Sequence, residues 1–273
     1  MYRSLLRSVK SPQFVYFAFG FIVALTISKV SVLLEPGRLS KNKYLQCVCF
    51  GDSITQEASS PERDGWVSAL SAYWIRRVEV RNRGFSGYNT RWALKIYEKV
   101  VLGEKPDVIV IFFGANDSID ESVAQHVPLD EYKDNLKKMV LMTKKSLDST
   151  KVILMTPPPV YEPVLEERNQ AKGKTLLVDR SNERTLLYVN AVKDIGKEFG
   201  LPVVDNFNTM EVDSPNRNNY LRDGLHLSQL GNQRVFENIE TVITKQLPQL
   251  IPDHLKLYQP HWSEIVENPS ILS

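Results

Sequence analysis

Short apolar runs alternate along this chain with segments whose apolar residues recur at helical spacing. A continuous apolar run is typical of a parallel strand, because helices cover both faces of such a sheet. Runs of this kind predict strands at 45–50, 78–82, 107–113, 151–156 and 202–205. Helical spacing predicts helices at 65–76, 89–102, 129–147, 180–199 and 228–246, the fourth ending at Gly200 as a C-cap. The alternation predicts an α/β protein, a three-layer α/β/α sandwich around a five-stranded parallel sheet.

Residues 1–43 follow a different pattern. Basic residues without any acid begin the chain, and an apolar stretch follows within 14–34, interrupted by Lys29. This arrangement is typical of a secretory signal or a signal anchor, although a full membrane span needs about 20 apolar residues. We therefore expect an N-terminal basic and apolar segment at 1–43 that associates with membranes through 14–34, and a separate domain at 44–273. A helix buried against that domain is the alternative.

Composition and charge exclude several function classes. The 34 basic and 32 acidic residues give a net charge of +2, and no basic stripe interleaved with aromatics indicates nucleic-acid binding. The only cysteines, Cys47 and Cys49, lie two apart on one predicted strand, where their parallel side chains are poorly placed for a disulfide. We expect buried thiols there. Four scattered histidines complete no zinc site, so we expect neither metal nor cofactor.

A serine follows the first predicted strand, in Gly51-Asp52-Ser53. Ligands bind at the carboxyl edge of a parallel sheet, and a serine there becomes a nucleophile when a base lies within hydrogen-bond reach. His226 is the natural base, because Asp223 lies three residues earlier and can accept a bond from the imidazole Nδ1–H. A lone histidine is more often a core or surface residue. The α/β-hydrolase alternative requires Gly-x-Ser-x-Gly, which is absent around Ser53.

Two further segments supply candidate donors for an oxyanion. Gly87 allows its backbone N–H a close approach to substrate, because no Cβ stands in the way. The Asn116 side-chain amide and the Ser53 N–H would be the other donors. Each residue alone reads as a turn residue, but the ordered set of donors, nucleophile, base and carboxylate predicts a serine esterase.

Five segments carry a resemblance to a known family: 50–56, 82–92, 113–118, 126–129 and 223–228. Together they resemble the SGNH (GDSL-type) hydrolase superfamily and, within it, the isoamyl acetate-hydrolysing esterase-like branch. The resemblance covers 44–266 and leaves out 1–43. It implies a flavodoxin-like SGNH hydrolase fold and metal-free hydrolysis of carboxylic esters through an acyl-enzyme on Ser53. It also implies a cytoplasmic protein, whereas the N-terminal segment indicates a membrane or secretory location.

The substrate is expected to be a small ester with a short, acetate-type acyl group. Candidates for its pocket are residues beside the proposed catalytic positions: Asp52, Phe85, Tyr88, Trp92 and Tyr161. Aromatic residues at such spacings more often fill a core, and Asp52 more often caps the turn after its strand. The alternatives are a lipid, lysophospholipid or sugar-acetyl esterase of the same fold, or a membrane-tethered binding protein without turnover. The intact set of catalytic residue types argues against the last.

Overall fold

The computed structural model describes residues 44–176, 178–211 and 216–272. The apolar segment at 14–34 and its predicted membrane association lie outside these residues. Within them, no helix combines the length and the apolarity that crossing a membrane requires.

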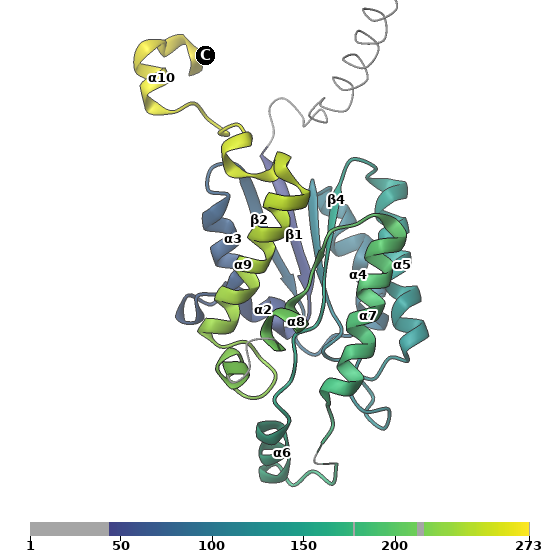
Figure 1. Cartoon of the computed structure of the whole chain (residues 1–273). Helices are drawn as coiled ribbons and strands as arrows, with labels where there is room; N and C mark the ends of the chain where they lie inside the picture. Colours follow the sequence, from purple (N-terminus) through teal and green to yellow (C-terminus); the bar gives the residue numbers. More distant parts are fainter. Residues whose placement is uncertain (1–43, 177, 212–215, 273) are drawn as a thin grey trace, which may run out of the picture. The chain divides into compact units, whose positions relative to one another are not determined.

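A five-stranded, fully parallel sheet forms the centre of the domain, as predicted (Figure 1). Its strands are β1 (Leu45–Gly51), β2 (Val78–Gly84), β3 (Val108–Phe112), β4 (Lys151–Met155) and β5 (Val203–Val204). The spatial order is β2-β1-β3-β4-β5, the flavodoxin-like order, in which the winding reverses between β1 and β3. The carboxyl ends of these two strands are where such a fold binds its ligands.

Helices cover both faces of the sheet, which completes the predicted three-layer sandwich (Figure 1). On one face lie α3 (Trp66–Tyr73) and α9 (Gln229–Gln246), and on the other lie α4 (Thr90–Val100), α5 (Leu129–Ser146) and α7 (Asn182–Phe199). Alternate residues of β1 enter the two cores: Cys47 and Cys49 pack on the α3/α9 side, Val48 and Phe50 on the other. Both cysteines are free and fully buried, as expected.

Polar caps shift the starts of three helices from the predicted positions. The side chains of Asn89, Ser181 and Ser228 accept backbone N–H bonds at the starts of α4, α7 and α9, so each helix begins just after its cap. Gly200 ends α7 in the left-handed conformation, as predicted. The predicted helix at 65–76 is shorter than expected, because a turn follows Tyr73 and Arg76 adopts a φ of 62°.

Several short helices were not predicted. They are α2 (Ser53–Gln56), α6 (Glu162–Ala171), α8 (Asn206–Glu211) and α10 (Trp262–Glu267), together with the 3₁₀ turns Glu57–Ser59, Pro61–Arg63, Leu102–Glu104, Asn216–Tyr220, Pro248–Leu250, Pro252–His254 and Pro269–Leu272. Figure 1 places α6 beyond the carboxyl ends of the strands. Only Leu165 and Asn169 of α6 are buried, so its apolar pattern was too sparse to predict a helix.

Two glycines bring backbones into direct contact where β1 and β2 end. Gly51 and Gly84 are partners in the register of these strands. A Cβ on Gly84 would lie 2.0 Å from the Gln56 backbone nitrogen, and one on Gly51 would lie 2.6 Å from the Phe112 carbonyl oxygen. These contacts leave no room for a side chain: the backbone of Gly84 packs directly on α2, and that of Gly51 packs on the end of β3.

We expect Gly84→Ala to lower the free energy of unfolding by about 1–3 kcal/mol, because its methyl group must displace the backbone of α2. Urea unfolding measures the change. Gly103→Ala is the matched control: its Cβ would lie 3.6 Å from the Glu98 carbonyl oxygen, an ordinary contact, and a change within about 0.5 kcal/mol is expected. Equal stability of the two variants would contradict the close-packing argument.

Candidate active site

Ser53 begins α2 immediately after β1, at the carboxyl edge of the sheet. The preceding Asp52 caps this helix, with its Oδ1 accepting the Ile54 N–H at 2.8 Å. The Asn82 side chain donates to the Thr55 carbonyl oxygen at 2.7 Å, which holds the helix from the β2 side. The serine is therefore presented on a short, rigid turn.

Two consecutive hydrogen bonds connect Ser53 to His226 and His226 to Asp223. The distance from His226 Nε2 to Ser53 Oγ is 3.0 Å, and that from His226 Nδ1 to Asp223 Oδ2 is 2.8 Å. Because a carboxylate only accepts, Nδ1 carries the proton and Nε2 is free to accept from the serine hydroxyl. The three residues predicted to form a nucleophile, base and carboxylate series have the geometry that this role requires.

Asp223 is held in its charged form. Burial by itself raises the pKa of this carboxyl, but hydrogen bonds from the His226 side chain and backbone outweigh burial and bring the pKa below its usual range. The carboxylate is therefore ionised at neutral pH, where its negative charge stabilises any positive charge that forms on the imidazole.

The unpredicted helix α6 anchors the loop that carries Asp223 and His226. The Tyr161 N–H donates to the Gly224 carbonyl oxygen at 2.9 Å, and Arg168 Nη1 lies 3.3 Å from Asp223 Oδ2. Gly224 adopts a φ of 81°, and a Cβ there would lie 2.8 Å from the Tyr161 carbonyl oxygen. Tyr161, predicted as a pocket residue, thus supports through its backbone the loop at 222–226, which we call the base loop.

A shared carboxylate connects the same loop to the segment that follows Ser53. Glu57 Oε2 lies 2.6 Å from Arg222 Nη2 and 2.6 Å from Arg63 Nη1. The two arginines come from opposite ends of the domain sequence. Their common partner holds the base loop in register with α2.

Asn116 and the Gly87 turn lie together, as the sequence predicts for a pair of oxyanion donors. Asn116 Nδ2 donates one hydrogen to the Tyr88 carbonyl oxygen at 2.9 Å, which leaves its second N–H available. Gly87 adopts a φ of 79°, and its carbonyl oxygen accepts from Gln125 Nε2 at 2.8 Å. Among the described residues, nothing accepts the Gly87 N–H.

The next residue, Asp117, secures the other end of the same turn. Its Oδ1 accepts from the Thr90 N–H at 2.8 Å and from Thr90 Oγ1 at 2.5 Å, while its buried Oδ2 has no partner in the described part of the chain. Burial raises the pKa of Asp117 to about 7 and that of Asp52 to about 6. Asp52 is 1% exposed and caps α2, in line with the capping role that is more usual for an aspartate at such a turn.

Arg180 joins the site without having been predicted. Its Nη2 lies 3.2 Å from Asn116 Oδ1, and its Nη1 donates to the Ala115 carbonyl oxygen. We expected a helix from residue 180, but α7 begins after its cap Ser181, so Arg180 precedes the helix. Since 64 residues separate it from Asn116, no local spacing could have indicated this contact.

A row of aromatic rings extends from the Gly87 turn into α4. The ring centroids of Phe85 and Tyr88 are 5.2 Å apart, those of Tyr88 and Trp92 are 6.0 Å apart, and Phe85 packs on the core ring of Phe50. These three of the four predicted pocket aromatics are partly buried. Their packing against one another and against Phe50 holds the rings in place near the Gly87 turn.

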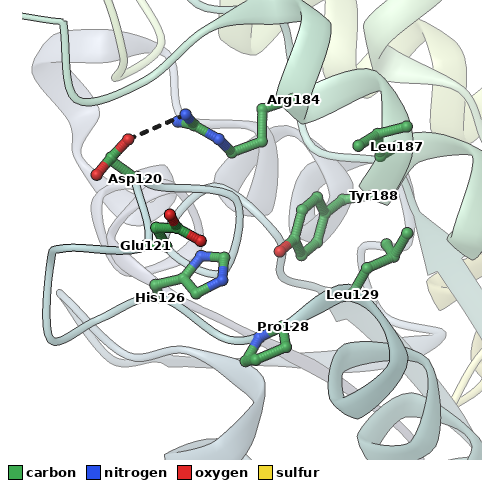
Figure 2. Close-up of a pocket in the computed structure, with 8 residues that line it drawn as sticks. All are labelled: Asp120, Glu121, His126, Pro128, Leu129, Arg184, Leu187 and Tyr188. Carbon is green, nitrogen blue, oxygen red and sulfur yellow. Dashed lines mark hydrogen bonds and ion pairs between the residues drawn. The ribbon is translucent and has the colours of Figure 1, made fainter.

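A surface cavity of about 450 Å³ lies between the 120–128 loop and the first turns of α5 and α7 (Figure 2). Its lining is mixed: Asp120, Glu121, His126, Pro128, Leu129, Arg184, Leu187 and Tyr188. None of the predicted site residues lines it. His126 Nδ1 lies 2.8 Å from the Ile119 carbonyl oxygen, a contact that holds the imidazole against the backbone of its own loop. Within the described ranges, no group of histidine, cysteine and acidic side chains is arranged to hold a metal ion.

Comparisons with known proteins place this chain in a family. The sequence model of the GDSL-like Lipase/Acylhydrolase family matches residues 49–234. The mouse protein named isoamyl acetate-hydrolyzing esterase 1 homolog is 41% identical over 234 residues, which cover 82% of this chain and 89% of the mouse protein. Its human counterpart is 40% identical over 231 residues, with the same coverage of both chains.

Solved structures share the fold. The lipase/acylhydrolase from Enterococcus faecalis superposes with a TM-score of 0.61 and 31% identity, covering 79% of this chain and all of that one. The acetyl xylan esterase AlAXEase gives a TM-score of 0.60 at 19% identity, covering 73% of this chain and all of that one, a likeness of fold alone. Sequence and architecture agree, so the chain belongs to the GDSL-like lipase/acylhydrolase family and is a carboxylic-ester hydrolase.

Proposed function

We propose that this enzyme hydrolyses short-acyl carboxylic esters, acetate esters above all, through an acyl-enzyme on Ser53. The hydrogen-bonded series Ser53–His226–Asp223 carries the proposal, because it provides a nucleophile, a base and a fixed carboxylate at hydrogen-bond distances. The names of the mouse and human relatives, which refer to isoamyl acetate, support the acetate preference.

Acylation begins when Ser53 Oγ attacks the ester carbonyl carbon and His226 Nε2 takes the hydroxyl proton. The carbonyl π electrons move to oxygen, which gives a tetrahedral oxyanion. The imidazolium that forms is stabilised by the Asp223 carboxylate at Nδ1.

The oxyanion accepts hydrogen bonds from the Ser53 N–H, the Gly87 N–H and the second N–H of the Asn116 amide. These donors are held before substrate arrives: Ser53 by its turn, and the other two by bonds of the Tyr88 and Gly87 carbonyl oxygens. Loss of one such donor typically lowers turnover by about 10²- to 10³-fold.

The intermediate collapses when the carbon–oxygen bond to the alcohol breaks and His226 Nε2–H protonates the leaving oxygen. A water molecule then gives a proton to His226 and attacks the acyl-enzyme. The second oxyanion collapses to the free acid, and the proton returns from His226 to Ser53 Oγ, which restores the enzyme.

The aromatic row beside Gly87 favours a small acyl group. Phe85 and Tyr88 lie close to Gly87 in the sequence; their rings pack against each other, and the Phe85 ring packs against the core ring of Phe50. Rings that are packed in this way do not move aside easily for a long acyl chain, because their displacement would leave voids or cause clashes in the core.

Hydrolysis of p-nitrophenyl esters from acetate to palmitate by the full chain tests the mechanism. We expect acetate or butyrate to be cleaved fastest, no cleavage by Ser53→Ala above the uncatalysed rate, and a loss of about 10²- to 10³-fold in Asn116→Ala. Ser60→Ala, whose side chain makes no cap bond, is the matched control with full activity. Turnover that survives Ser53→Ala would overturn the mechanism, and cleavage of long chains only would replace the acetate preference with a lipid one.

The buried carboxyl of Asp117 gives a second test, through stability. Its pKa of about 7 lies above the ordinary value of about 3.9, so between these pH values the folded chain binds more protons than the unfolded chain. Stability therefore falls as pH rises through this window. Asp52, whose pKa is about 6, contributes with the same sign.

Asp117→Asn keeps an acceptor oxygen for Thr90 and removes the titration. We expect a shallower decline of the free energy of unfolding from pH 5 to pH 8, measured by urea unfolding at each pH, and a variant more stable than the parent at pH 8. Asp120→Asn is the control, because Ser122 hydrogen bonds lower the pKa of Asp120 and it stays ionised across this window. An unchanged slope in Asp117→Asn would show that this carboxyl does not titrate as its burial implies.

A further inference from the structure

We propose that Arg180 is a positioning residue that fixes the Asn116 amide in one orientation and strengthens it as an oxyanion donor. The proposal rests on the proposed function, because it concerns the same oxyanion. Arg180 comes from the segment before α7, far in sequence from the residues it serves.

The orientation of the Asn116 amide is fixed at both ends. Its Oδ1 accepts from Arg180 Nη2 at 3.2 Å, and its Nδ2 donates to the Tyr88 carbonyl oxygen at 2.9 Å. A flipped amide would place its NH₂ group against the guanidinium, which only donates, and its oxygen against another oxygen. The observed orientation is therefore the one that satisfies both neighbours, and it keeps one N–H available.

The charge of Arg180 acts on the same amide. The residue is 6% exposed, and its hydrogen-bond acceptors in the described structure are the Ala115 carbonyl oxygen and Asn116 Oδ1. A cation that withdraws electron density from the amide oxygen makes the amide N–H a stronger donor, because linked hydrogen bonds polarise one another. The positive charge also lies one amide group away from the place where the oxyanion forms, and such preorganised charge lowers the barrier.

No described carboxylate neutralises the guanidinium by a direct ion pair. The adjacent Asp179 carboxylate forms its ion pair with Lys174 Nζ, at 3.1 Å, although among nearby carboxylates its charge favours the Arg180 cation most. The carboxyls of Asp52 and Asp117 interact with Arg180 only over a longer range. A buried guanidinium that has no carboxylate within ion-pair distance among the described residues is costly for stability, so its position beside a proposed oxyanion donor fits a role in the reaction.

The backbone around Arg180 is held on both sides. The Asp179 carbonyl oxygen accepts the Asp120 N–H at 2.8 Å, and Ser181 caps α7. A purely structural anchor for the Asn116 segment would need only the bond to the Ala115 backbone. The second bond, to the Asn116 side chain, orients and polarises the amide group.

A double-mutant cycle between Arg180 and Asn116 tests the proposal. We expect Arg180→Gln to lower kcat/KM for p-nitrophenyl acetate by about 10- to 100-fold, the range for a hydrogen bond to a charged group. In an Asn116→Ala background the same substitution should cost less than about 2-fold, because its effect passes through the amide. The affinity of a boronic acid, which forms a tetrahedral adduct with the serine, should fall in proportion to kcat/KM.

The matched control is Arg184→Gln, which removes an arginine four residues later that pairs with Asp120 on the surface (Figure 2). It should keep the parent activity. If Arg180→Gln does not fold, Arg180→Lys is carried through the same cycle. We expect it to lose activity in the parent and little in Asn116→Ala.

An equal loss in both backgrounds, or no loss in the parent, would overturn the role of Arg180. Ser53→Ala, assayed in parallel, separates this result from a failure of the proposed mechanism. Inactive Ser53→Ala with additive Arg180 effects rejects only the present inference, whereas active Ser53→Ala rejects the mechanism itself.

Discussion

The close approach of three backbones at the end of β1 is the constraint on which the site depends. Gly51 and Gly84 face each other in the sheet, and neither leaves space for a side chain against Phe112 or α2. Because the strands are parallel and in register, the segments after β1, β2 and β3 emerge at one level. Ser53, Gly87 and Asn116 follow these strand ends, so the sheet itself positions the proposed nucleophile and two proposed donors.

Polar groups that the sheet cannot position are held by networks of other residues. Asn116 and Asp117 are consecutive in sequence and secure Tyr88 and Thr90, so one short segment fixes both sides of an adjacent turn. The base loop depends instead on α6 and on the carboxylate of Glu57. The carboxyls of Asp52 and Asp117 and the guanidinium of Arg180 are buried, and their desolvation is a cost in stability that the well-packed cores on both faces offset.

The sequence predicted what depends on local pattern. Continuous apolar runs indicated β1, β3 and β4, and the three-residue spacing of Asp223 and His226 indicated their pairing, because such spacing closes within one turn. The helix starts were placed too early, although Asn89, Ser181 and Ser228 are residue types that favour caps and could have corrected them. Helix α6 buries too few residues to show a period. The contact of Arg180 with Asn116 is set by tertiary packing, which no single-sequence pattern reveals.

The bond between Ser53 and His226 spans 173 residues, which sets the order in which the site is completed. During synthesis the proposed nucleophile leaves the ribosome long before its base. At about 5–20 residues per second, the delay is on the order of ten seconds or more. In that interval the serine has no partner to activate it, so the nascent chain is chemically inert toward esters. Under the proposed mechanism, catalytic competence is therefore a late event in synthesis, because it waits for the segment that carries Asp223 and His226.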